Sequence, residues 1–206
     1  MDYVVAGVDV GSPKKGFHAV ALNADGVLGV LGSPDAQEIA GWCVEMGAAA
    51  VGVDAPCRWS TTGRARQAER ELMKAGIWCF SSPDRERALQ HPKNQYGWML
   101  AGEALYKAMA PRYQLFVGKI EADQTVFETF PHAVTCSLSG KIVSARNKSL
   151  DRRALLAKHG IADKSLRNID LVDAALCALT AHYLLAGKWR THGDRESGHI
   201  VVPSLA

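Results

Sequence analysis

Cysteine is scarce in this chain, and its spacing excludes two kinds of structure. The five cysteines are odd in number and contain no C-x-x-C pair (Cys43, Cys57, Cys79, Cys136 and Cys177). This spacing argues against a zinc site and against a disulfide framework. We therefore expect a protein of the reducing cytoplasm.

Long apolar runs and a strong net charge are lacking as well. The most apolar helix-like run, residues 171–187, contains Asp173 and His182 and is too short to span a bilayer, so we expect no membrane association. The formal charge is +3 with a pI near 8.6, which permits a polyanionic partner without requiring one. No repeat or linker divides the sequence, so we expect one domain over residues 1–206.

The first feature that is present is an apolar strand containing an acid. Residues 3–11 read YVVAGVDVG, a β-branched run that carries Asp9 and breaks at Gly11. Such a run suits a strand buried on both faces. A carboxylate in it is costly unless a metal ion, a phosphate-binding turn or a helix N-terminus pairs with it. The plainer alternative is that Asp9 accepts backbone N–H bonds from the turn at Gly11 and Ser12.

The rest of the pattern predicts an α/β fold. An Asp-Gly turn within residues 23–26 joins two apolar runs, so an antiparallel three-stranded meander is expected to open the chain. A helix then returns the chain to a strand parallel to the first. The expected strands are 3–11, 17–22, 27–31, 49–54 and 125–130, with short extended pieces at 77–80 and 198–203; the expected helices are 36–46, 61–75, 94–109, 150–159 and 170–186.

Four further acids accompany Asp9. Asp54 ends the strand 49–54, Glu128 lies in the strand 125–130, and Asp170 and Asp173 share one face of the last helix. If these strands are neighbours, the carboxylates converge at one edge of the sheet. Several oxygen ligands at one point suit Mg²⁺ or Mn²⁺. Two such ions ~4 Å apart could clamp the attacking and leaving oxygens of a phosphodiester.

Each of these acids also has an ordinary structural interpretation. Asp54 could close a turn by bonding to its own backbone. Glu128 could lie exposed on an edge strand. Asp170 could cap the last helix, with Asp173 as its capping-box partner. Each interpretation is reasonable alone, but the five acids together favour a shared metal site.

Basic residues near these acids are candidates for substrate binding: Lys14, Lys15, Arg58, Arg66 and Arg70. Arg66 and Arg70 are expected on one helix face, where they could hold phosphates. The alternative is a solvated helix face balanced by Glu69 and Glu71.

Other chemically capable side chains show weaker patterns. Trp59 beside Arg58 could stack on a base or simply be buried. His18, His91 and His132 have no metal-like spacing, and we expect them to be structural; His91 and Lys93 could also lie on a substrate-facing loop. Cys57 and Ser60 have no recognisable base partner, so nucleophilic catalysis has little support.

Several short motifs, taken in order, resemble the domain-of-unknown-function 429 family. They are GVDVG at 7–11, VDAP at 53–56, FETFP at 127–131 and DLVDAALCALTA at 170–181, followed by GHIVVP at 198–203. The family often has Trp where this chain has His199. The resemblance covers nearly the whole chain, and the order and spacing of the motifs make it specific.

The resemblance implies a fold class and a site. The family is regarded as predicted nucleases of the ribonuclease H-like fold, with a five-stranded mixed sheet, an antiparallel opening meander and helices on both faces. The last helix is also similar to that of Holliday-junction resolvases, where two acids at this spacing complete a four-carboxylate metal site. Carried over, this makes Asp9, Asp54 or Glu128, Asp170 and Asp173 the metal ligands.

The leading hypothesis is a metal-dependent nuclease or phosphodiesterase using Mg²⁺ or Mn²⁺, with nucleic acid as its partner. Asp9 is expected to bridge two ions, with Asp54 and Glu128 sharing their shells, Asp173 holding the second ion and Asp170 orienting it. The alternative is a nucleotide- or nucleic-acid-binding protein without catalysis. In that case the acids would lie far apart or be paired with arginines.

Overall fold

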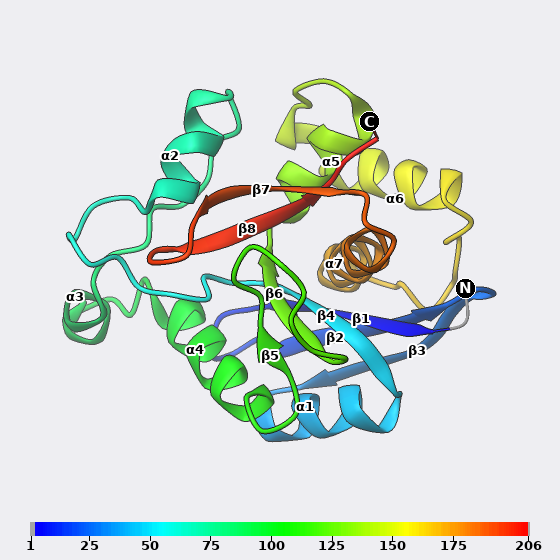
Figure 1. Ribbon diagram of the computed structural model, residues 1–206, viewed down its shortest axis with the longest axis horizontal. Helices are drawn as coiled ribbons and strands as arrows, with labels where there is room; N and C mark the ends of the chain where they lie inside the picture. Colours follow the sequence, from blue (N-terminus) through cyan, green and yellow to red (C-terminus); the bar gives the residue numbers. More distant parts are fainter. Residues whose placement is uncertain (1–2, 206) are drawn as a thin grey trace.

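The computed structural model describes residues 3–205 and shows a mixed β-sheet with helices on both faces (Figure 1). The strands are β1 (Val4–Val10), β2 (Phe17–Asn23), β3 (Gly26–Ser33), β4 (Ala48–Asp54), β5 (Gln114–Leu115), β6 (Thr125–Thr129), β7 (Trp189–Asp194) and β8 (Gly198–Pro203). The helices are α1 (Ala36–Glu45), α2 (Gln67–Lys74), α3 (Arg85–Gln90), α4 (Gly97–Met109), α5 (Pro131–Ser139), α6 (Lys148–Lys158) and α7 (Ile169–Leu185), with a 3₁₀ turn at Ala145–Asn147.

The strand order is β3-β2-β1-β4-β6-β8-β7, and β5 pairs separately with β6. Strands β2 and β7 run antiparallel to their neighbours, and β1, β4, β6 and β8 are parallel. The antiparallel opening meander and the mixed α/β architecture are therefore confirmed. The expected count of five strands describes only the central part, because β5, β7 and β8 extend the sheet to eight strands.

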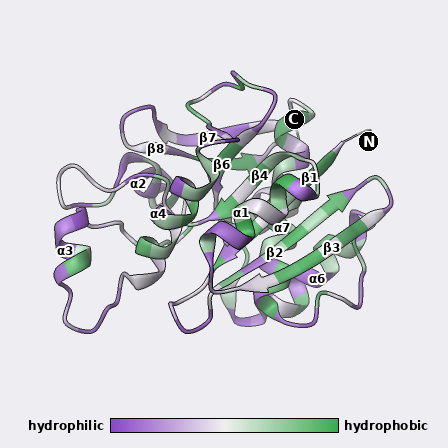
Figure 2. Ribbon diagram, turned by 90° about the horizontal axis from the view of Figure 1, so that it is seen from below, coloured by the Kyte–Doolittle hydropathy of each residue, from purple (hydrophilic) through white to green (hydrophobic). Residues whose placement is uncertain are grey.

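Alternation along the central strands divides the core into two layers. In β1, Val5 packs in the cluster with α7, whereas Ala6 and Val8 pack in the cluster with α1 and α4. Figure 1 shows α7 on one side of the sheet and α1 and α4 on the other, and Figure 2 shows the hydrophobic colour of the central strands. Most of α7 is buried, as expected for a helix that is apolar around its circumference.

Helix α7 approaches the sheet unusually closely because two strand positions lack a side chain. A Cβ on Gly7 of β1 would lie 2.1 Å from the carbonyl oxygen of Ala174, and one on Gly52 of β4 would lie 2.5 Å from that of Cys177. Such separations are far below van der Waals contact. The glycines thus let the middle of α7 lie directly over β1 and β4.

Several predicted elements need correction. The helix expected from residue 61 begins at Gln67, and residues 77–80 form no strand. Pro131 was expected only to close a strand, but it occupies the first turn of α5, where its missing N–H costs nothing. Strand β7 was not predicted. None of the helices within residues 3–205 has the length and apolar character needed to span a membrane.

Candidate metal centre

Asp9 lies near the carboxyl end of β1, with its side chain on the α7 face of the sheet. Residue alternation sets this direction, because Val5 and Gly7 of the same strand also face α7. The Gly11 N–H bonds to the Gly16 carbonyl at 2.9 Å, so it is not available to Asp9 as the plainer interpretation required. Asp9 is 9% exposed, and burial, helped by the carboxylates of Asp173 and Asp170, raises its pKa to about 7.

The closest grouping of metal-ligand atoms contains Asp9, His18 and Asp170. One atom of each lies within 4.8 Å of the others. His18 is directly opposite Asp9 in the antiparallel pairing of β1 with β2, and Asp170 enters from the first turn of α7. The buried Nδ1 of His18 has no hydrogen-bond partner among residues 3–205, and an orphan nitrogen of this kind is available to coordinate an ion.

Asp54 lies beside this grouping. It pairs with Asp9 across the parallel strands β1 and β4, and paired residues point to the same face of a sheet. Loss of hydration, together with the charges of Asp9 and Asp173, raises the pKa of Asp54 well above its usual range. The plainer interpretation had Asp54 bonded to its own backbone, but the structure records no such hydrogen bond within residues 3–205.

Asp173 is buried and carries an arginine partner. Its Oδ1 accepts a hydrogen bond from Nη1 of Arg152 on α6, and the two side chains form an ion pair. Burial raises the pKa of Asp173, while Arg152 opposes that shift. Asp170 does not cap α7, because the cap is Asn168, whose side chain accepts from the Leu171 N–H at 2.8 Å.

Two lysines face the acids. Lys15, in the turn after β1, places Nζ 3.0 Å from Oδ2 and 3.2 Å from Oδ1 of Asp170. Lys148 begins α6 and is exposed. Lys15 and Lys148 both lower the pKa of Asp9, and Lys148 also lowers that of Asp173. The acid cluster therefore has cations at its rim.

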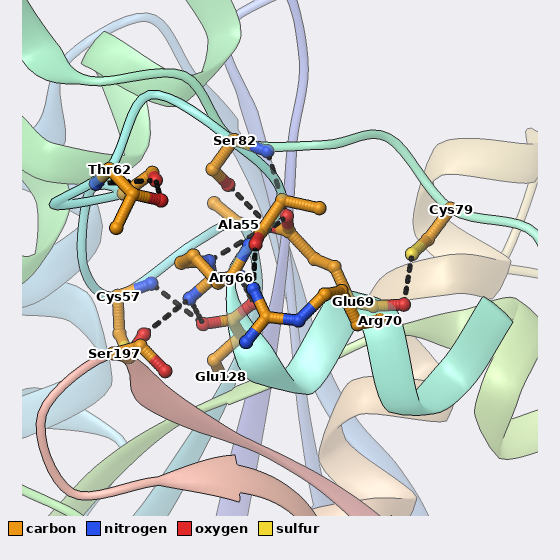
Figure 3. A network of polar contacts seen from close by, with 12 residues as sticks. Ala55, Cys57, Thr62, Arg66, Glu69, Arg70, Cys79, Ser82, Glu128 and Ser197 are labelled. Carbon is orange, nitrogen blue, oxygen red and sulfur yellow. Dashed lines mark hydrogen bonds and ion pairs between the residues drawn. The ribbon is translucent and has the colours of Figure 1, made fainter. Parts of the chain in front are cut away.

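Glu128 corrects the expected ligand set. It pairs with Val53 in the β4–β6 ladder, and Val53 belongs to the core layer of α1 and α4, so Glu128 faces away from Asp9 and Asp54. Its two carboxylate oxygens accept from Arg66 at 2.8 and 2.5 Å, and one also accepts from the Cys57 N–H at 2.9 Å (Figure 3). At 4% exposed on a central strand, Glu128 is also not the edge-strand surface residue of the plainer interpretation.

Arg66 corrects the expected substrate-binding set. It is 2% exposed and is held between Glu128 and Glu69, the latter at 2.8 Å from Nε. Arg70 is exposed and bonds to the Ala65 carbonyl, so of these two arginines only Arg70 reaches solvent. Burial removes Arg66 from contact with any phosphate.

Among the other candidates, Lys14 and Arg58 are exposed as expected for phosphate contacts. Of the five expected acids, the structure brings Asp9, Asp54, Asp170 and Asp173 together. Glu128 is near enough to raise the pKa of Asp54, but it points to the opposite face of the sheet and is paired with Arg66.

Three residues of the site were missed by sequence reasoning: His18, Lys148 and Arg152. A signal for His18 existed, because the pairing of β1 with β2 around the turn at residues 11–16 sets it opposite Asp9. Lys148 and Arg152 lie on one face of α6 at i, i+4. Their approach to the acids depends on how α6 packs on α7, which no local pattern encodes.

The donor set fits a hard divalent cation. Carboxylate oxygens of Asp9, Asp54 and Asp170 are the ligand type that Mg²⁺ and Mn²⁺ prefer. Burial and the neighbouring carboxylates raise the pKa of Asp9 and of Asp54, so both acids need nearby positive charge to stay ionised. A divalent ion would supply that charge, with the free Nδ1 of His18 as an added nitrogen donor.

Comparison with known proteins gives a family match and one distant structural likeness. The family described as "Protein of unknown function (DUF429)" matches residues 7–197. None of the curated proteins compared with the chain is significantly similar to it. The solved "Thermus thermophilus RuvC structure" is 21% identical, with coverage of 89% of this chain and 96% of that chain and a TM-score of 0.46.

Proposed function

This chain belongs to the DUF429 family, and from that premise and its acid cluster we propose that it is a metal-dependent phosphodiesterase acting on nucleic acid. The observation that carries the proposal is the grouping of Asp9, His18 and Asp170 within 4.8 Å, beside Asp54. A cluster of ionised carboxylates repels an anionic substrate. Such a cluster becomes a phosphate site only when a cation binds in it.

Asp9 is the central ligand in this proposal, because it lies between Asp54 on β4, His18 on β2 and Asp170 on α7. Asp173 is kept ionised and in position by its ion pair with Arg152. Mg²⁺ or Mn²⁺, when bound, lowers the pKa of water and polarises a phosphoryl oxygen. Glu128 is outside the proposed ligand set because it points to the opposite face of the sheet from Asp9 and is buried against Arg66.

The chain's own groups then have distinct tasks in hydrolysis. Lys15 and Lys148 neutralise the phosphate that enters beside Asp9. The attacking water forms a bond to phosphorus, and the bond from phosphorus to one sugar oxygen breaks. Asp54, which has no recorded donor within residues 3–205, accepts the proton that the water loses. The sugar oxygen leaves as a hydroxyl after it takes up a proton from solvent.

The test is a calorimetric titration with Mn²⁺ and with Mg²⁺, followed by cleavage assays on single-stranded, duplex and branched DNA and RNA. Asp9→Asn is expected to abolish cleavage and weaken ion binding at least tenfold. The matched control is Asp25→Asn, an exposed acid in the turn between β2 and β3, which should change neither. Undiminished cleavage by Asp9→Asn would refute the proposal.

A second candidate function, nucleic-acid binding without catalysis, is favoured by one observation. Two of the five acids, Asp173 and Glu128, are paired with arginines. In that case the chain would bind oligonucleotides with no turnover at any concentration of Mn²⁺ or Mg²⁺. Binding without cleavage in the assays above selects this function.

We also propose a cytoplasmic location and a single folding unit over residues 1–206. All five cysteines are free, which suits a reducing compartment. One continuous sheet draws strands from both ends of the described residues, which suits one cooperative domain.

A further inference from the structure

Residues 77–83 form an irregular segment that presents two large aromatic side chains to solvent. Trp78 is 79% exposed and Phe80 is 71% exposed. A single exposed aromatic needs no explanation, but two within three residues concentrate apolar surface at one place. Neither side chain contributes to the core at this exposure, so their role lies at the surface.

The segment is nevertheless held firmly at both ends. The Ile77 N–H bonds to the Leu72 carbonyl at 2.9 Å. Ser82 bonds to the Glu69 carboxylate through its N–H at 2.9 Å and through its hydroxyl at 2.5 Å (Figure 3). Glu69 is itself fixed by Arg66, which is fixed by Glu128. The buried ionic network therefore anchors the segment, and a rigid segment loses little entropy when it binds a partner.

Phe80 lies beside the Arg66–Glu69–Glu128 network and shares a small cavity with Asp54, one acid of the cluster. Its ring meets that of Trp98 on α4 in a tilted edge contact, with centroids 6.2 Å apart and planes at 63°. Phe80 and Trp98 line a small cavity of about 50 Å³ together with Asp54 and Phe130. An edge contact leaves a face of the Phe80 ring open, beside an acid of the proposed metal centre.

A neighbouring segment of the same chain, residues 56–65, carries positive charge. Residues 56–65 include the exposed Arg58 and Arg64 and contain no acid. This stretch is joined to the aromatic segment by a bond from the Ser60 N–H to the Pro83 carbonyl at 3.1 Å. Arginines beside exposed rings match the phosphates and the bases of a nucleic acid strand.

We propose that Phe80, with Trp78 beside it, is a stacking site for an unpaired nucleobase of the strand held at the acid cluster. The choice of a nucleic acid rests on the proposed function; the choice of an unpaired base rests on the open ring face and the flanking arginines. A base inside a duplex already stacks on its neighbours, so the site favours single-stranded or frayed substrates.

The experiment measures binding by fluorescence anisotropy in the full-length Asp54→Asn variant, which removes the proposed proton acceptor and keeps the grouping of Asp9, His18 and Asp170. The probes are a labelled single-stranded oligonucleotide and an abasic strand of the same length. Phe80→Ala and Phe80→Leu should each weaken binding of the oligonucleotide by about 5- to 150-fold and leave the abasic strand unaffected. Phe80→Tyr should restore binding, because it keeps an aromatic face.

The control is Leu28→Ala, which removes an exposed apolar side chain on β3 and should not change affinity. Normal binding by Phe80→Leu would overturn the inference, since it would mean that only an apolar surface is needed, as for a protein partner. An equal loss on the abasic strand would overturn it as well. Cleavage by the wild-type chain tests the proposed function separately, because Phe80-dependent binding can hold or fail whether or not cleavage occurs.

Discussion

Asp9 carries an electrostatic penalty that depends on pH. Burial and two neighbouring acids raise its pKa to about 7, whereas in the unfolded chain an aspartate titrates near pH 4. Between these values the folded state binds a proton that the unfolded state has released. The unfolding free energy contributed by Asp9 is therefore fully present below about pH 4 and is lost as the pH rises through about 7.

The metal-free protein should consequently unfold more easily at pH 8 than at pH 5.5. For Asp9 the difference between these two pH values is roughly 2 kcal/mol, because only about one and a half pH units separate pH 5.5 from a pKa of about 7. Urea unfolding of wild type and Asp9→Asn at both pH values measures it, and the variant should lose the share of the dependence that comes from Asp9, while Asp54 and Asp173 keep theirs. A variant with the same pH dependence as wild type would show that Asp9 titrates normally.

Glu128→Gln removes one charge, as Asp9→Asn does, but we expect a different effect on stability because Glu128 is paired with Arg66. Glu128→Gln leaves the buried Arg66 with Glu69 as its remaining acidic partner. We expect the unfolding free energy to fall by about 3–5 kcal/mol, as when one partner of a buried pair is removed, with Mn²⁺ affinity little changed.

The matched control for this change is Glu103→Gln. Glu103 pairs with the exposed Arg85 at 2.9 Å, and removal of an exposed pair should cost about 1 kcal/mol or less. A large loss of Mn²⁺ affinity in Glu128→Gln, with normal stability, would return Glu128 to the ligand set.

The individual side chains differ in how far sequence could place them. Asp9 and Asp54 each follow an apolar run that predicts a strand. Their positions at the strand ends were enough to predict that the two side chains lie close together. Glu128 looked equivalent, but the register that pairs it with Val53 turns it to the other face. Arg66, which captures it, is remote in sequence, and no local pattern links the two.

The close packing of helix α7 on the sheet depends on two strand positions that lack a side chain. The helix carries Asp170 and Asp173, and its distance from β1 and β4 is set by Gly7 and Gly52. A side chain at either glycine would push the helix, and the two acids with it, away from the sheet.

Gly7→Ala should therefore destabilise the protein by about 3 kcal/mol or more, through overpacking against the Ala174 carbonyl. Gly41→Ala on α1 is the control, because its Cβ would meet nothing within 4 Å and should add up to about 1 kcal/mol of helix stability. Thermal and urea unfolding of both variants measures the contrast. Equal stability of the two variants would show that α7 adjusts without cost.

Element boundaries were predictable where the signal was local. The helix start before α1 and the hairpin between β2 and β3 follow from capping and turn residues. Pro131 was ambiguous, because proline both ends strands and begins helices. The α2 start was misplaced because Thr61, Thr62 and Gly63 look like a cap, while the structure uses Arg66, whose carbonyl receives the Arg70 N–H.

At the scale of the whole molecule, the acid cluster lies where α7 packs against the sheet. A cation bound there would link β1, β4 and α7, so binding and folding are coupled. The class of fold and the order of its central strands were predictable from sequence. Strand β8 was expected as the short extended piece 198–203. Strands β5 and β7 were not, because pairing at a sheet edge depends on the assembled core.

Thermal unfolding should show a single transition whose midpoint rises with Mn²⁺. At a hundredfold excess over the dissociation constant the gain is about 2.7 kcal/mol, or roughly 5–10 °C for a chain of this size. Differential scanning calorimetry of wild type and Asp9→Asn measures it, with little rise expected in the variant. A midpoint that does not move at millimolar Mn²⁺ would argue against a metal centre.

The separation of the acids along the chain has a consequence for biosynthesis. Asp9 and Asp54 leave the ribosome early, whereas Asp170 and Asp173 come from α7, near the end of the described chain. A nascent or prematurely terminated polypeptide therefore carries only half of the carboxylates. Under the proposed function, stalled translation products could not cut the messenger RNA beside them, and hydrolytic competence would arise only once synthesis has passed α7.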